Sequence, residues 1–235
     1  HLCALLRERH QPLPDLDATH LRLDLGTFRI RWEMHTEFVT WTFMVPLQAE
    51  GFGTREPVGA LAAVPHGWAA ALPGLCLCSL HLWVLPTQAF GSGSLVRHVL
   101  HEDTLVASTV ADGHGEVYTD FALHADGCSR MVLLAGAMTQ RRLGRLVQRL
   151  LEVETYRMAA LLGLPVARAA AADLGTGERE LAALADAIRT ASRHAEPDLL
   201  DRLTRLAGQV ESQYAATHSR FSASRAYFEL VDLRI

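Results

Sequence analysis

The densest run of residues that could do chemistry lies between Arg29 and Phe43. Polar and apolar residues alternate through its first half, so on a strand the ionisable side chains line one face. They are Arg29, Arg31, Glu33, His35 and Glu37. The alternation changes phase after Phe38, which predicts a turn or bulge near His35–Glu37. A histidine beside glutamates can act in acid–base chemistry or bind a metal. We favour the simpler alternative, a solvated sheet face whose charges pair across strands.

A row of arginines follows on a predicted helix that Thr139 can cap. Arg141, Arg145 and Arg149 are spaced by four residues and could receive an anionic ligand. Positive charge in the first half of a helix opposes the helix dipole, a mild cost that indicates function or an acidic partner. A solvated helix face remains the favoured interpretation. We assign no catalytic residue, and the candidate ligand-binding residues are Arg31, Glu33, His35, Glu37, Arg141, Arg145 and Arg149.

Twelve histidines invite a metal interpretation, especially at His98 and His101, or at His114 and His124. A metal site needs three or four converging ligands, and spacing alone shows no convergence, so we expect neither a metal site nor a cofactor. The four cysteines form no paired pattern, which favours a reducing compartment. Phosphate-loop, dinucleotide-binding and nucleophile-elbow motifs are absent from the sequence. An enzyme is therefore the less favoured class.

Composition describes a folded protein rather than a disordered one. The 235 residues are 49% apolar and 20% charged, proportions typical of globular domains. The formal net charge of −4 disfavours nucleic-acid binding, which usually needs a basic surface. No continuous apolar run reaches the ~18–20 residues of a membrane span.

The residue pattern changes near Gly136, which predicts an α+β protein. An antiparallel or mixed β-sheet domain with a short N-terminal helix is expected over residues 1–136, and a helical hairpin or bundle with a long C-terminal helix over 137–235. Asp112-Gly113 and Asp126-Gly127 are expected turns, and a short helix is expected at 66–72. The expected strands are 21–25, 27–34, 38–45, 75–85, 94–101, 104–111, 115–122 and 129–135.

Three helices are expected in the second part of the chain. The first runs from Thr139 to Leu162, where Gly163 and Pro165 end it. The second begins near Thr176, and the third runs from Asp198 to Ile235.

The last of these helices carries apolar or small residues at steps of four and three, which predicts one buried face. Its period near 3.6 predicts packing against the chain's own helices rather than a long supercoil. No Gly, Asn or Pro closes it, so we expect the helix to continue past Ile235. The residues of the face are Leu199, Leu203, Leu206, Val210, Tyr214, Thr217, Phe221, Ser224, Phe228, Val231 and Ile235.

Three stretches together resemble one protein family. They are RWEMHTEFVTWTF (31–43), RRLGRLVQRLLEVETYRMAALLGLP (141–165) and SRFSASRAYFELVDLRI (219–235). They are similar to the DUF3422 family of bacterial proteins of unknown function that are predicted to be membrane-anchored. The resemblance implies the soluble part of an inner-membrane protein, with the anchor in a C-terminal segment absent from this chain. The unpaired cysteines favour the cytoplasmic side of that membrane. It implies no catalytic residue.

We therefore expect a non-enzymatic scaffold or sensor domain coupled to a membrane anchor, with the long helix as a stalk or oligomerisation surface. The expected partners are a second copy of the chain or a membrane protein, and no nucleic acid. One alternative is the cytosolic domain of an ion-transport protein with CorA-like architecture, an analogy of organisation only. Another is a metal-dependent hydrolase centred on Glu33, His35 and Glu37.

Overall fold

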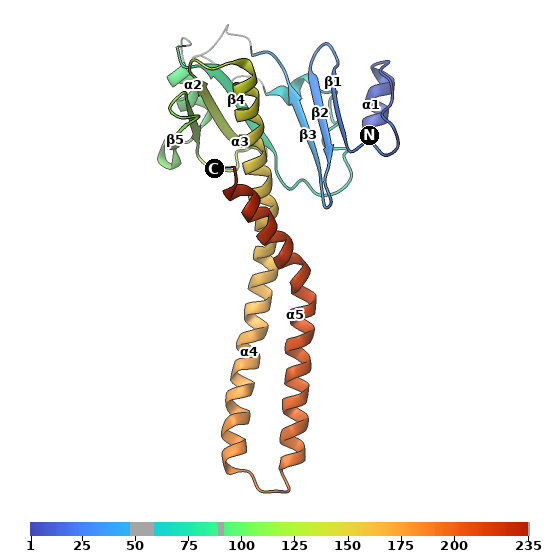
Figure 1. Ribbon diagram of the computed structural model, residues 1–235, viewed down its shortest axis with the longest axis vertical. Coiled ribbons are helices and arrows are strands. Elements are labelled where there is room, and N and C mark those ends of the chain that lie inside the picture. Colours follow the sequence, from blue (N-terminus) through green and yellow to red (C-terminus); the bar gives the residue numbers. More distant parts are fainter. Residues whose placement is uncertain (48–58, 89–91, 235) are drawn as a thin grey trace. The chain divides into compact units, whose positions relative to one another are not determined.

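The computed structural model describes residues 1–47, 59–88 and 92–234 (Figure 1). The protein is α+β, as expected: antiparallel and mixed sheets come first and long helices follow. The chain divides into two compact units, His1–Leu143 and Gly144–Ile235.

The first sheet is antiparallel, with strand order β1-β2-β3. Its strands are β1 (His20–Asp24), β2 (Arg29–Met34) and β3 (Val39–Met44). The β2–β3 connection is the turn expected near His35, where the His35 N–H donates to the Phe38 carbonyl at 2.8 Å. The phase change of the apolar pattern therefore marks a hairpin.

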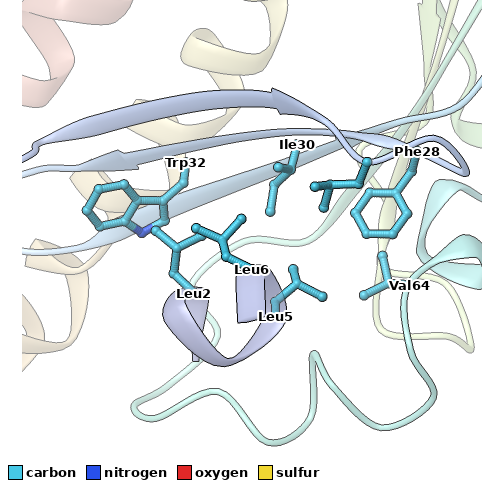
Figure 2. Packing of buried hydrophobic residues seen from close by; sticks show 8 residues of the cluster. Leu2, Leu5, Leu6, Phe28, Ile30, Trp32 and Val64 are labelled. Carbon is cyan, nitrogen blue, oxygen red and sulfur yellow. The ribbon is translucent and has the colours of Figure 1, made fainter. Parts of the chain in front are cut away.

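Helix α1 (Leu2–Glu8) covers one face of this sheet. Phe28, Ile30 and Trp32 alternate toward the helix and are buried. The three leucines of α1, Leu2, Leu5 and Leu6, pack against them (Figure 2). Val64, just after the 3-10 helix η1 (Ala60–Ala63), completes this core.

The second sheet is mixed and has strand order β4-β7-β6-β5. Its strands are β4 (Leu80–Pro86), β5 (Val106–Val110), β6 (Gly115–Thr119) and β7 (Ser129–Ala135). Strand β4 runs parallel to β7, and the other pairs are antiparallel. The expected Asp112-Gly113 turn joins β5 to β6, and both residues have positive φ. Strand β7 is the buried centre of this sheet, with Val132 and Leu133 fully covered.

The strand expected at 94–101 is wrong, because α2 (Ser92–Val99) occupies it. Leu95, Val96 and Val99 are buried and pack in one cluster with Trp83 and Val132 of the second sheet. Spacings of one, three and four residues place these side chains on one side of a helix. The run is rich in β-branched and apolar residues, and burial against the sheet overrides that strand propensity.

The helix expected at 66–72 is also wrong. These residues form successive turns, with the Trp68 N–H bonded to Pro65 O and the Ala71 N–H to Gly67 O. Gly67 has φ of +75°, a conformation that interrupts a right-handed helix.

Helix α3 (Gln140–Leu161) has the expected bounds, and the Thr139 hydroxyl accepts the Arg142 N–H at 3.3 Å as its cap. The expected stop at Gly163 is wrong, because α4 (Gly163–Thr190) begins there after a single non-helical residue. Pro165 lies in the first turn of α4, where no backbone N–H is required. Gly163 is needed for packing instead: a Cβ at this position would lie 2.5 Å from Ser224 Oγ.

Helices α4 and α5 (Glu196–Asp232) form an antiparallel hairpin (Figure 1). Three cross-helix contacts give the direction: Gly163 to Ser224, Gly177 to Leu206, and Asp173 to Gln213. The start expected at Thr176 is wrong, since Thr176 lies inside α4 and its hydroxyl bonds the Ala172 carbonyl. The long helix packs against the chain's own α4, as expected. It ends at Asp232, ahead of a turn at 233–234, and Ile235 lies outside the described residues.

Candidate functional site

Two of the candidate ligand-binding residues meet on β2. Arg31 Nη2 donates to Glu33 Oε1 at 2.6 Å, and the two side chains are 29% and 31% exposed. They lie on the sheet face opposite the buried Ile30 and Trp32. The pair is therefore a partly solvated ion pair on a sheet face, an arrangement worth little stability.

His35 and Glu37 lie in the β2–β3 turn. The His35 ring stacks on Phe38 with ring centroids 4.5 Å apart, and its Nε2 lies 3.3 Å from Thr40 Oγ1. Glu37 is exposed. A hollow of about 440 Å³ opens instead beside His114 and Glu116, at one end of the second sheet. None of the candidate residues from 31 to 37 lines it.

The arginine row lies on the exposed side of α3. Arg141, Arg145 and Arg149 are all exposed and follow one another by about one helical turn. The neighbouring Arg142 contacts the β5–β6 turn, with its Nη2 2.7 Å from Asp112 Oδ2 and 3.0 Å from the Ala111 carbonyl. Arg142 thus ties the start of α3 to the second sheet, while the row faces solvent.

A different set of polar side chains converges where β6 ends. The Asp120 carboxylate is fully buried, and its Oδ2 lies 2.8 Å from His124 Nε2 and 3.4 Å from His101 Nδ1. The same oxygen accepts the His101 backbone N–H at 3.0 Å, and Oδ1 accepts the Ala122 N–H at 3.1 Å. The two imidazoles stack with centroids 4.4 Å apart. We call His101, Asp120 and His124 the His–Asp cluster.

The His–Asp cluster keeps its carboxylate ionised. Burial alone raises the pKa of Asp120, but the N–H donors of His101 and Ala122, together with His124, outweigh it and hold that pKa below its ordinary value. The next residue, Phe121, has φ of +50° and a side chain that is 56% exposed. Bulky residues rarely adopt this conformation, and such strain is concentrated at functional sites.

A second polar network lies further along the same connection. Asp126 Oδ2 lies 3.6 Å from His81 Nε2 and 3.4 Å from Arg130 Nη2, and Oδ1 accepts the Cys128 N–H at 3.1 Å. Burial raises the pKa of Asp126, but the Cys128 N–H and the Arg130 guanidinium outweigh it and lower that pKa. The buried Cys128 thiol lies 3.1 Å from Ser79 Oγ, and burial raises its pKa.

The sequence patterns did not indicate the His–Asp cluster. His101 follows α2, Asp120 directly follows β6, and His124 lies in the β6–β7 connection, so only the fold brings them together. His101 and His124 stood out as histidines, but each in a pair with the wrong neighbour. One local signal was available: Asp120 and His124 are four residues apart just after a strand.

The helical hairpin has a narrow buried seam. On α4, Leu184 is fully buried, and Gly177 lies close to Leu206 of α5. On α5, Leu206, Thr217 and Val231 are buried. The single buried face expected along α5 is therefore only partly right, because five residues expected in it are 39–60% exposed. They are Leu203, Val210, Tyr214, Phe221 and Phe228.

Eight exposed apolar residues follow one rule on the two helices. Each of the eight lies four residues after, or three before, a residue of the seam: Leu181 follows Gly177 by four, and Leu203 precedes Leu206 by three. Leu164 and Leu200 are also exposed and lie outside this rule. Either step is a rotation of roughly 40–60° in the same sense around an α-helix. Because α4 and α5 are antiparallel, rotations of the same sense bring both rows to one face of the hairpin. We call this the hairpin face, and its residues are Leu174, Leu181, Ile188, Leu203, Val210, Tyr214, Phe221 and Phe228.

One helical stretch of the described chain is long and apolar enough to cross a membrane. It covers Gln140–Thr190, and its most apolar 18-residue window has a mean hydropathy of 1.3 and is 11% buried. The mean hydropathy of a window tolerates isolated charged residues, whereas a continuous apolar run does not, so this stretch contains no such run. Core helices of soluble proteins pass the same criterion, so the stretch alone assigns no location.

The sheets and the long helices define the class: an α+β protein with an antiparallel helical hairpin. The protein carries the His–Asp cluster beside its second sheet and the hairpin face on α4 and α5. The chain belongs to the DUF3422 family, described as proteins of unknown function, whose model matches residues 1–235. No curated protein and no solved structure matches the chain. Function therefore has to be argued from the features themselves.

Proposed function

We propose that this chain is a non-enzymatic scaffold that docks a second copy of itself through the hairpin face. The observation that carries the proposal is the set of eight apolar side chains on the hairpin face, each 39–60% exposed. Exposed apolar patches of this kind mark interaction surfaces. A two-helix hairpin buries only one narrow seam, so the rest of its apolar surface needs a cover.

The spacing of the hairpin face favours a helical cover. On α4, Leu174, Leu181 and Ile188 are seven residues apart, and on α5 so are Tyr214, Phe221 and Phe228. Heptad spacing presents side chains to a neighbouring helix over several turns. A second hairpin related by a two-fold axis offers the same face in return, and the product is a four-helix bundle.

Charge and area agree with a second copy as the occupant. Residues 163–232 contain eight arginines and ten carboxylates, a formal charge of 8 − 10 = −2, so two hairpins repel one another only weakly. Covering eight half-exposed apolar side chains gains roughly 1 kcal/mol each, or about 16 kcal/mol for two faces. Association costs about 4–15 kcal/mol. A dissociation constant near micromolar, about −8 kcal/mol, lies within this balance.

The two alternative functions have weaker support. A hydrolase centred on Glu33, His35 and Glu37 needs a substrate cleft, but Glu33 pairs with Arg31 on a partly solvated face and the hollow beside His114 lies elsewhere. A CorA-like transport role rests on the order of sheet and long helices alone. Neither has an observation comparable to the hairpin face.

Sedimentation equilibrium of the tag-free chain tests the proposal. The wild type is expected to dimerise in the micromolar range. Val210→Glu with Phe221→Glu places two charges on the hairpin face and is expected to give a monomer with unchanged helical circular dichroism. The matched control, Ser212→Glu with Ser219→Glu, charges exposed positions on the far side of α5 and is expected to remain dimeric. A wild type that is monomeric at every concentration contradicts the proposal, and so does a face that binds anionic vesicles instead of a second copy.

We further propose that the protein acts at the cytoplasmic side of a bacterial inner membrane, attached through a segment outside this chain. The resemblance of residues 31–43, 141–165 and 219–235 to the DUF3422 family supports the membrane attachment, and the free cysteines favour the cytoplasmic side. Fractionation of the full-length protein from its native cells tests it: recovery in the inner-membrane fraction after a high-salt wash is expected. Recovery in the soluble fraction would contradict the placement and leave the hairpin proposal standing.

A further inference from the structure

We propose that His101, Asp120 and His124 bind one divalent transition-metal ion, such as zinc. Their ligand atoms are His101 Nδ1, Asp120 Oδ2 and His124 Nε2, and all three lie within 4.8 Å of one another. Two imidazoles and a carboxylate are a donor set that suits zinc and its neighbours in the first transition row. The proposal is independent of the hairpin face.

The spacing of the donors fits a tetrahedral ion. Bonds of about 2.0–2.2 Å to nitrogen and oxygen place neighbouring ligand atoms about 3.3 Å apart in a tetrahedral zinc site. The observed separations from Asp120 Oδ2 are 2.8 Å to His124 and 3.4 Å to His101. The two separations from Asp120 Oδ2 are within about half an ångström of that spacing, and the two imidazole nitrogens lie within 4.8 Å of one another. Bonds to the ion would replace the contacts that the two imidazoles now make with Asp120 Oδ2.

The surroundings hold the ligands in place. Asp120 Oδ1 accepts the Ala122 N–H, and Thr119 Oγ1 donates to the Arg130 carbonyl at 2.9 Å, which fixes the backbone on each side of the carboxylate. Outer contacts of this kind orient metal ligands. The His124 side chain is 7% exposed and that of His101 is 60% exposed. One side of the cluster is thus open to solvent, which leaves a coordination position for water and a path for the ion.

The neighbouring set of His81, Asp126 and Cys128 is a poorer metal site, although its donors also converge. The Arg130 guanidinium lies 3.4 Å from Asp126 Oδ2 and already neutralises that carboxylate. A second cation there would meet direct repulsion at short range. The two sets therefore make a matched comparison: within residues 1–47, 59–88 and 92–234, a guanidinium pairs with Asp126 and none pairs with Asp120.

Calorimetric titration of zinc into the tag-free, chelator-treated full chain tests the inference. We expect one ion per chain with a dissociation constant in the micromolar range or tighter. His101→Ala removes an exposed ligand without opening the core and is expected to weaken binding at least tenfold. His114→Ala, which removes an exposed histidine outside the cluster, is expected to bind as the wild type does. Thermal melting without metal checks that each variant is folded.

Cobalt substitution separates the two donor sets. Nitrogen and oxygen ligands are expected to give visible d–d bands without the near-ultraviolet charge-transfer band of a thiolate ligand. The inference is overturned by any of three results: no zinc binding by the folded wild type, unchanged binding in His101→Ala, or a thiolate band that disappears in Cys128→Ser.

Discussion

A substitution at Gly163 gives the sharpest test of how the helical hairpin is built. A Cβ at this position would lie 2.5 Å from Ser224 Oγ and 3.2 Å from Ser224 Cβ. Alanine adds up to about 1 kcal/mol of helix propensity over glycine. Overpacking at a close helix contact costs about 1–3 kcal/mol, so after the gain in propensity Gly163→Ala should destabilise the protein by about 0–2 kcal/mol.

The partner substitution isolates the contact. Ser224 Oγ is buried without a hydrogen-bond partner among the described residues, so removing it breaks no bond. In the double variant Gly163→Ala with Ser224→Gly, both near atoms are gone. Chemical denaturation should then show recovery of most of the loss, with a coupling free energy of about 1 kcal/mol or more between the two sites.

The competing explanation makes a different prediction. If Gly163 served as a helix stop that needs a positive φ, alanine would strain the backbone whatever stands at position 224. The two substitutions would then add without coupling. Additive free energies of unfolding would refute the packing role of Gly163 and the close approach of α4 and α5.

Three further predictions concern single side chains. Arg157→Ala should lower the free energy of unfolding measured in urea by about 1–3 kcal/mol, because Arg157 makes two hydrogen bonds of 2.8 and 2.9 Å to the buried Glu154 carboxylate. A loss below a few tenths of a kcal/mol would contradict this. Cys128 is buried and its pKa is raised, so an alkylating reagent should modify the exposed Cys3 well before Cys128, as peptide mass spectrometry can show; equal rates would be the contrary result. The pKa of Asp120 is lowered in the folded protein. The carboxylate therefore stabilises the fold at pH values above its ordinary pKa of 3.8, and this stabilisation is lost as the pH falls through the lower folded-state pKa. Below pH 4 and in the presence of a chelator, the free energy of unfolding of the wild type should therefore fall more steeply than that of Asp120→Asn. Parallel pH profiles of the two proteins would contradict the stabilising role of the ionised Asp120.

Local patterns predicted the elements that local forces determine. The short N-terminal helix, the turn near His35 and the Thr139 cap follow from residues close together in sequence, and all are present. The strand predicted at 94–101 was wrong because the strand propensity of these residues and their helical spacing favour different structures. Packing against the second sheet favours the helix.

The His–Asp cluster and the hairpin face depend on long-range structure, so the sequence patterns did not predict them. Periodicity correctly gathered the apolar residues of α5 on one side of the helix. It could not divide them between a seam covered by α4 and a flank that the described residues leave exposed, because that division depends on where α4 lies. The His–Asp cluster combines three separate segments, and no spacing rule connects His101 to Asp120.

Site-specific photo-crosslinking tests the central claim most directly. A photoreactive phenylalanine analogue at Tyr214, which is 60% exposed on the hairpin face, should yield a covalent dimer linked to α4 or α5 of the second copy. The same analogue at Ser212, exposed but two residues away and so on another side of the helix, should yield little dimer. Equal dimer yields at the two positions, or none at Tyr214, would contradict the hairpin face as the surface that joins two copies.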